Sequence, residues 1–238
     1  MSELRTQLLE TATTLLTSGA DEAAFVEAGF GQLLLSEAEG GFGGDWGDVE
    51  AVLRAVGYHR PELDLAGVIT APSGGDPVLD GALACVALIG GALQKALDLS
   101  LDHANTRVQF GKPLGKQQAV QQALAVLAQE AAIVAVAAVS AAKARDHCDA
   151  AFEIASAKLR ANRAAGTGAA IAHQVHGAIG FTAEYPLNRS TRKLIEWRSA
   201  FGNDAYWAGQ VGAFATALGG AGLWGGVTER ADALLGGS

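Results

Sequence analysis

Long proline-free stretches, in which apolar residues recur at helical spacing, constrain this chain more than any other feature. Residues 80–106 contain no proline. Residues 117–145 place apolar side chains at alternating steps of four and three, at Val120, Leu124, Leu127, Ala131, Val134 and Ala138. Such a seam is typical of antiparallel helix packing. Because Ile133, Val136 and Ala137 form a second apolar side, we expect this helix to be buried on two faces.

Helical signals continue on both sides of this region, so the sequence predicts an all-α fold. The further predicted helices cover 3–16, 22–26, 48–56, 146–172 and 186–201, and a last one begins after Asn203 or Asp204. Residues 61–77 are rich in turn formers and are expected to be a linker. We therefore predict an N-terminal helical segment over 1–72 and a helical bundle over 73–238.

The uncharged run 205–228 is long enough to be mistaken for a membrane span. Its many glycines favour instead a helix that breaks at Gly219-Gly220 and trails into a loose tail, so no membrane contact is expected. The polar, amphipathic segment 2–10 does not resemble a secretory signal. Cys85 and Cys148 lack the C-x-x-C spacing of a metal or redox site, which favours a reducing, cytoplasmic setting.

Composition narrows the classes of function. Half of the residues are hydrophobic but only 6% are aromatic, a mixture that favours closely packed helices over a β-sandwich. The formal net charge of −8 argues against a nucleic-acid surface. His173 and His176 can share a helix face, but no third ligand lies nearby in the sequence, so we expect no metal site.

Two segments carry the signs of a ligand site. The first is Arg107-Val-Gln-Phe-Gly-Lys-Pro-Leu114, and the second is Gln174-Val-His-Gly-Ala-Ile-Gly180. The planar guanidinium of Arg107 suits pyrophosphate oxygens, and the glycines permit close approach of a ligand to the backbone. Each segment also has a purely structural interpretation, since Arg107 suits a helix C-terminus and Gly177 can close a helix.

In their order and spacing these segments resemble the C-terminal helical domain of the acyl-CoA dehydrogenase family. There the motifs R-x-x-F-G and Q-x-x-G-G-x-G contact the ADP half of a FAD that belongs to a neighbouring subunit. Ala178 departs from this pattern, because the family has its second glycine there. The resemblance implies FAD contacts for Arg107, Gln109, Phe110, Gln118, Gln174, Val175, His176, Gly177, Ala178 and Asn203.

Two parts of such a dehydrogenase are not found in the sequence. Members of the family have a central β-domain, whereas here Ala71-Pro72 leads directly to the helix that contains Asp80. The family's general base is a glutamate that removes the proton α to the thioester. Alignment places Phe201 at the usual base position and Gly81 at the alternative one. The resemblance therefore implies no catalytic residue in this chain.

Three hypotheses remain open. In the first, the chain is a non-catalytic subunit that shares FAD with a full-length acyl-CoA dehydrogenase partner in a heterotetramer, with the acyl-CoA substrate mainly on the partner. Because heteromeric relatives are associated with sterol degradation, a steroid-CoA is a candidate substrate. In the second, the chain is a self-sufficient dehydrogenase that uses Asp80 or Glu196 as the base. In the third, it is a helical scaffold without flavin.

Overall fold

The chain folds as an all-α protein, as predicted. The computed structural model describes residues 3–109, 111–147 and 149–235. The α-helices are α1 Glu3–Ser18, α2 Glu22–Glu27, α3 Trp46–His59, α4 Ala66–Thr70, α5 Pro77–Thr106, α6 Gln118–His147, α7 Ala151–His176, α8 Pro186–Ser199 and α9 Asp204–Leu235. Short 3-10 helices cover Phe30–Gln32, Glu37–Glu39, Ala71–Ser73, Leu114–Lys116 and Gly177–Phe181.

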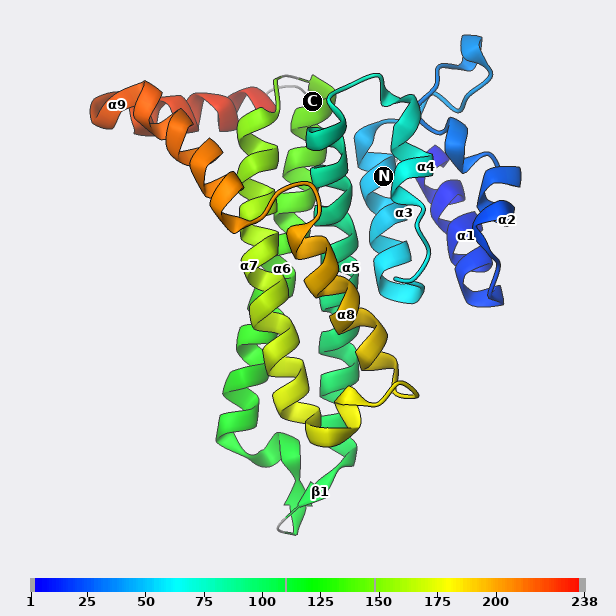
Figure 1. Ribbon diagram of the computed structural model, residues 1–238, viewed down its shortest axis with the longest axis vertical. Coiled ribbons are helices and arrows are strands. Elements are labelled where there is room, and N and C mark those ends of the chain that lie inside the picture. The colour runs from blue at the N-terminus through cyan, green and yellow to red at the C-terminus, as the bar shows by residue number, and fades with distance from the viewer. Residues whose placement is uncertain (1–2, 110, 148, 236–238) are drawn as a thin grey trace.

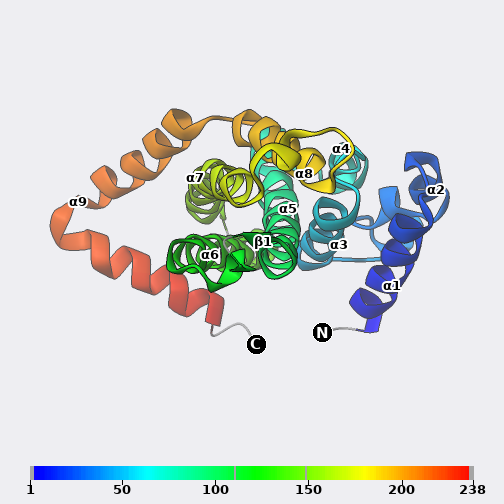
Figure 2. The same ribbon diagram turned by 90° about the horizontal axis from the view of Figure 1, so that it is seen from below.

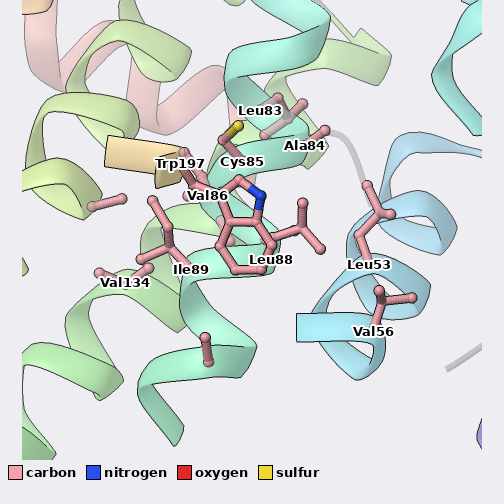
Figure 3. Close-up of a cluster of buried hydrophobic side chains, with 14 of the residues drawn as sticks. Leu53, Val56, Leu83, Ala84, Cys85, Val86, Leu88, Ile89, Val134 and Trp197 are labelled. Atoms are coloured by element: carbon pink, nitrogen blue, oxygen red, sulfur yellow. The ribbon is translucent and has the colours of Figure 1, made fainter. Parts of the chain in front are cut away.

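Helices α5 to α8 form a bundle in which successive helices run in opposite directions (Figure 1). Helix α5 lies at its centre and packs against α3, α6, α7 and α8 (Figure 2). Figure 3 shows part of the core, where Trp197 of α8 lies beside α5 side chains such as Cys85 and Ile89, with Leu53 of α3 on the other side. The core cluster continues from α1 to the start of α9.

Local signals at the helix ends account for several boundaries. The carboxylate of Asp76 accepts hydrogen bonds from the Val78 and Leu79 amides at the start of α5, and Pro77 occupies the first turn. Asp21 caps α2, because its carboxylate accepts from Ala24 N at 3.2 Å. Asn203 caps α9 by accepting from Tyr206 N at 3.0 Å.

Two predictions about chain segments were wrong. The expected linker contains α4, because Ile69 is fully buried and tertiary packing stabilises a helix too short to form alone. The chain does break at Gly219, where φ is 67°, but no loose tail follows, because α9 continues to Leu235. Arg230 holds this second arm through a bidentate ion pair with Glu153 of α7.

The outer side of α6 also differs from the prediction. The predicted seam is buried at Leu124, Leu127, Ala131, Val134 and Ala138. On the second side, however, Val136 is 67% exposed, so the helix is buried on one face. Helices α5 and α6 are both long and apolar enough to cross a membrane by length and composition. In the apolar window of α5, 78% of the residues are buried within the protein, against 28% for α6.

The strands in the described ranges are β1 Val108–Gln109 and β2 Lys112–Pro113, which pair antiparallel with Val108 opposite Pro113. This hairpin projects from the end of the bundle where α5 stops (Figure 1). Between α4 and α5 the chain passes through a 3-10 turn and Gly74. The predicted absence of a central β-domain at this place in the chain is therefore confirmed.

A buried lysine ties α7 to the end of α8. The Lys158 ammonium is fully buried and donates to Asn162 Oδ1 at 2.5 Å and to the Trp197 carbonyl at 2.8 Å. The amide of Asn162 in turn donates to the Gly202 carbonyl at 3.4 Å. Burial lowers the pKa of Lys158 from 10.5 to about 8, because the charged form loses its hydration.

This depressed pKa makes stability depend on pH. The folded protein releases the Lys158 proton at a lower pH than the unfolded chain, so the free energy of unfolding rises as the pH rises above about 8. Urea denaturation should show a gain of about 1 kcal/mol between about pH 7.5 and about pH 9. Burial raises the pKa of Cys85 from 9.0 to about 11, which reverses the trend at higher pH and limits the window. Lys158→Met should remove the gain; a variant that keeps it would refute this assignment.

Candidate functional site

The two predicted motif segments meet at one end of the bundle. Helices α5 and α7 run in the same direction, so the residues that follow their C-terminal ends lie side by side, next to the hairpin (Figure 1). Between them is a hollow of about 480 Å³. It is lined by His103, Arg107, Gln109, Leu114, Val120, Gln174, Val175, His176, Gly177, Ala178 and Ile179. Segments more than sixty residues apart in the chain thus form one site.

Most of the predicted contact residues line this hollow, and two do not. Gln118 is exposed at the first turn of α6, where its neighbour Gln121 donates to the Gly115 carbonyl at 2.8 Å. Asn203 caps α9 just after the C-terminal end of α8 and does not line the hollow. Phe110 lies outside the described residues. The structure therefore assembles Arg107, Gln109 and the segment 174–178, but not Gln118 or Asn203.

Arg107 sets the charge of the hollow. Its backbone caps α5, with its amide donating to the His103 carbonyl at 2.9 Å. No carboxylate among the described residues forms an ion pair with its guanidinium. The C-terminal ends of α5 and α7 carry partial negative charge, which disfavours an anion. Arg107 opposes this charge, so a phosphate group would depend on it strongly.

Two stacked imidazoles form one wall of the hollow. The ring centroids of His103 and His176 are 4.6 Å apart, and those of His176 and Tyr185 are 5.2 Å apart. Burial lowers the pKa of both histidines, and for His103 the charges of His176 and Arg107 lower it further. Both rings are therefore neutral near pH 7. His176 Nδ1 bonds to the Ala172 carbonyl at 2.8 Å, and its other ring nitrogen, Nε2, is buried within the protein.

His103, which is not among the predicted contact residues, also lines the hollow. It lies four residues before Arg107 on the same helix, and residues at that spacing share a face. This spacing was a usable signal. His173, by contrast, faces away from the hollow, because Nε2 bonds to Thr191 Oγ1 at 2.9 Å and the ring stacks on Phe181.

Glycine is required at one point of the rim. Gly177 ends α7 with φ 65° and ψ −145°, a conformation that other residues rarely adopt. A Cβ added there would meet no atom within 4 Å, so the backbone angle and not crowding selects glycine. The surface beside it is open, which leaves the backbone of 177 and 178 accessible to a ligand.

The two predicted positions of a general base, Phe201 and Gly81, lie together in space. The ring of Phe201 rests on Gly81, because a Cβ added at Gly81 would overlap that ring. Phe201 is 47% exposed, and its φ of 54° makes it the non-glycine residue with positive φ in the described chain. The aromatic side chain of Phe201 thus packs directly against Gly81.

The nearby carboxylates are already engaged. Asp80 is 2% exposed and accepts from Arg145 Nε at 2.8 Å and from Ser73 Oγ at 2.5 Å. Glu196 is exposed on α8 and pairs with Lys193 at 2.9 Å. Both carboxylates therefore already have partners within the chain.

Comparison with known proteins identifies the family. Residues 79–215 match the model of the acyl-CoA dehydrogenase C-terminal domain. "Probable acyl-CoA dehydrogenase YngJ" of Bacillus subtilis is 39% identical over 120 residues, which is 49% of this chain and 31% of that protein. Acyl-CoA dehydrogenase IpdE2 of Mycobacterium tuberculosis is 38% identical over 100 residues, 41% of this chain and 30% of that protein. This chain belongs to the acyl-CoA dehydrogenase family.

The matched region is less than a third of the length of these curated relatives. Solved structures share the fold at lower identity. A glutaryl-coenzyme A dehydrogenase in complex with glutaryl-CoA superposes with a TM-score of 0.78 at 16% identity, covering 89% of this chain and 95% of that one. The ChsE4–ChsE5 complex of Mycobacterium tuberculosis gives 0.76 at 17% identity, covering 90% and 97%. The FAD complex of PigA gives 0.74 at 14%, covering 90% and 98%.

The contact between Gly81 and Phe201 can be tested by a double-mutant cycle. Gly81→Ala should destabilise the protein by about 1–3 kcal/mol, because the new methyl group overlaps the ring. In a Phe201→Gly background the same change should be neutral or stabilising, since alanine favours the helix. Denaturant unfolding of the four proteins measures both effects. Additive effects would show that the two positions do not touch.

Proposed function

We propose that this chain is a non-catalytic subunit of a FAD-dependent acyl-CoA dehydrogenase, which completes the FAD site of a full-length partner subunit. The observation that carries the proposal is the hollow lined by Arg107, Gln174 and Gly177, assembled in a chain whose two base positions hold Phe201 and Gly81. In this proposal residues 1–72 form an N-terminal segment and residues 73–238 the domain that meets the partner.

The residues present fit the diphosphate end of FAD. Arg107 offers a guanidinium without an ion-pair partner in the described chain, and Gln174 is exposed at the rim. Gly177 leaves its backbone accessible. Arg107 would bind phosphate oxygens, and Gln174 would donate to a neighbouring polar group. FAD, when bound, supplies the electron acceptor for dehydrogenation.

The missing base favours a partner. Proton removal α to a thioester needs a carboxylate free to accept a proton. Asp80 is buried in an ion pair with Arg145, which weighs against a self-sufficient dehydrogenase that uses this residue. The structural likeness to the ChsE4–ChsE5 complex supports a heteromeric assembly, and we propose a heterotetramer. The Arg107 guanidinium lines the hollow without an ion-pair partner in the described chain, and a scaffold without flavin would not need this arrangement.

The proposed substrate is an acyl-CoA thioester held mainly by the partner subunit. Names among the curated relatives include glutaryl-CoA dehydrogenase and 3-sulfinopropanoyl-CoA desulfinase, so the thioester is what these relatives share while the acyl group varies. A subunit without chemistry of its own leaves more room for a bulky acyl group, such as a steroid. Measuring the turnover of a steroid-CoA and of a short-chain acyl-CoA by the assembled enzyme would show which acyl group it prefers.

Loss of Arg107 should weaken FAD binding in the assembled enzyme. Arg107→Ala removes a charge-assisted hydrogen bond worth about 1.5–3 kcal/mol, so the FAD dissociation constant should rise ten- to hundredfold. Arg107→Lys keeps the charge but lacks the planar guanidinium, so its FAD dissociation constant should lie between those of the wild type and Arg107→Ala. Arg163→Ala, an exposed arginine of α7 outside the hollow, is the control. Flavin occupancy after dialysis measures the effect; unchanged occupancy in Arg107→Ala would contradict the assignment.

Isolation of the chain and substitution of its acidic residues test whether the partner subunit is needed for flavin binding and provides the general base. The chain purified alone should lack the visible absorbance of flavin, and flavin should appear when a full-length dehydrogenase subunit is co-expressed.

In the complex, Glu196→Gln should leave turnover within a few-fold, whereas loss of a general base costs about 10²–10⁴-fold. Asp80→Asn should lower the free energy of unfolding, because Arg145 loses its partner, but not turnover. An active, yellow protein from this chain alone would overturn the proposal.

A further inference from the structure

A second hollow lies between α7 and α8, which pack against each other in the bundle (Figure 1). Its volume is about 750 Å³, against about 480 Å³ for the hollow beside Arg107. Among the described residues, none lines both hollows. Sites for small molecules measure about 300–1,000 Å³, so the second hollow is large enough to hold a ligand of its own.

The floor of the second hollow is made by small residues of α7. Gly166, Ala169 and Ala170 line it within one turn of the helix, and Ile195 of α8 lines it from the other helix. Small side chains leave space between two packed helices that larger ones would fill. Ile195 is 50% exposed, so the hollow offers apolar surface to a ligand.

Two stacked rings also line the second hollow. Phe181 lies on His173 with ring centroids 4.0 Å apart and an angle of 16° between the ring planes. Hydrogen bonds hold both residues in place: Asn188 Nδ2 donates to the Phe181 carbonyl at 3.1 Å, and His173 Nε2 bonds to Thr191 Oγ1 at 2.9 Å. The Phe181 side chain is nevertheless 65% exposed. A held, exposed ring is suited to stacking against a flat apolar group.

The polar groups of the second hollow differ in whether they have partners. The Thr191 hydroxyl donates its proton to the Leu187 carbonyl at 3.1 Å, and Glu196 pairs with Lys193 at 2.9 Å. Arg192 is exposed, and no carboxylate among the described residues forms an ion pair with it. An apolar hollow with a single unpaired cation suits one anionic group on an apolar body better than it suits a sugar or a nucleotide.

We propose that the second hollow binds a small carboxylate with a flat apolar body, its carboxylate on Arg192 and its ring against Phe181. The planar guanidinium can accept both carboxylate oxygens as hydrogen-bond partners. Arg192 lies one turn of α8 after Asn188, the residue that holds Phe181, so one small molecule can reach both. Although the chain has a net charge of −8, Arg189 and Lys193 make this part of α8 basic, which attracts an anion.

Calorimetric titration of the purified chain with 1-naphthaleneacetate tests the proposal, with the neutral amide 1-naphthaleneacetamide as the matched probe. The carboxylate should bind with a dissociation constant of about 1 mM or lower, and the amide about fivefold more weakly. Arg192→Gln should weaken binding of the carboxylate about fivefold and remove the preference for it over the amide. Arg189→Gln is the control, because Arg189 is exposed on the same helix and does not line the hollow.

A second variant tests the position of the ligand. Ala170→Trp fills the hollow and should abolish binding of both probes, while circular dichroism establishes that the variant is folded. A wild type that does not bind 1-naphthaleneacetate at about 5 mM overturns the proposal. So does binding that is unchanged in Ala170→Trp, or a preference for the carboxylate that survives Arg192→Gln. These titrations need neither flavin nor partner, so their failure leaves the proposed FAD site untouched.

Discussion

The close approach of α3 and α5 is the constraint on which the rest of the structure depends. A Cβ at Gly57 would overlap the Leu88 carbonyl, and one at Gly91 would overlap the Arg54 carbonyl. Only glycine lets the two backbones lie this near each other. The contact fixes α5 at the centre of the bundle, where α6, α7 and α8 pack around it. Since Arg107 caps the end of α5, the position of the hollow follows from this packing.

Much of the fold could be predicted because local signals and tertiary packing agree. Apolar spacing indicated the long helices, and the break at Gly219 was visible in the glycine pair. What could not be predicted depends on contacts between distant residues. Helix α4 exists because Ile69 is buried, and the second arm of α9 is held by Arg230 and Glu153, which are 77 residues apart. No local pattern encodes these pairs.

The site shows the same limit. Motif spacing identified Arg107 and the segment 174–178, which lie at the C-terminal ends of two helices that run in one direction. It could not show that the ring of Phe201 rests on Gly81, nor that Arg145 engages Asp80 from 65 residues away. Those contacts bring two separate sequence observations, the residue at the predicted base position and a helical glycine, into direct contact. These contacts support the proposal that the chain holds a cofactor for another subunit's chemistry.

The central claim is that the hollow beside Arg107 holds the ADP end of a FAD whose flavin works on the partner. The most direct measurement uses FAD with a photoreactive azido group on its adenine, bound to the complex of this chain with a full-length dehydrogenase subunit. After irradiation and digestion, mass spectrometry should find the label on peptides of this chain that contain residues 107–116 or 174–180. Label confined to the partner subunit would contradict the account.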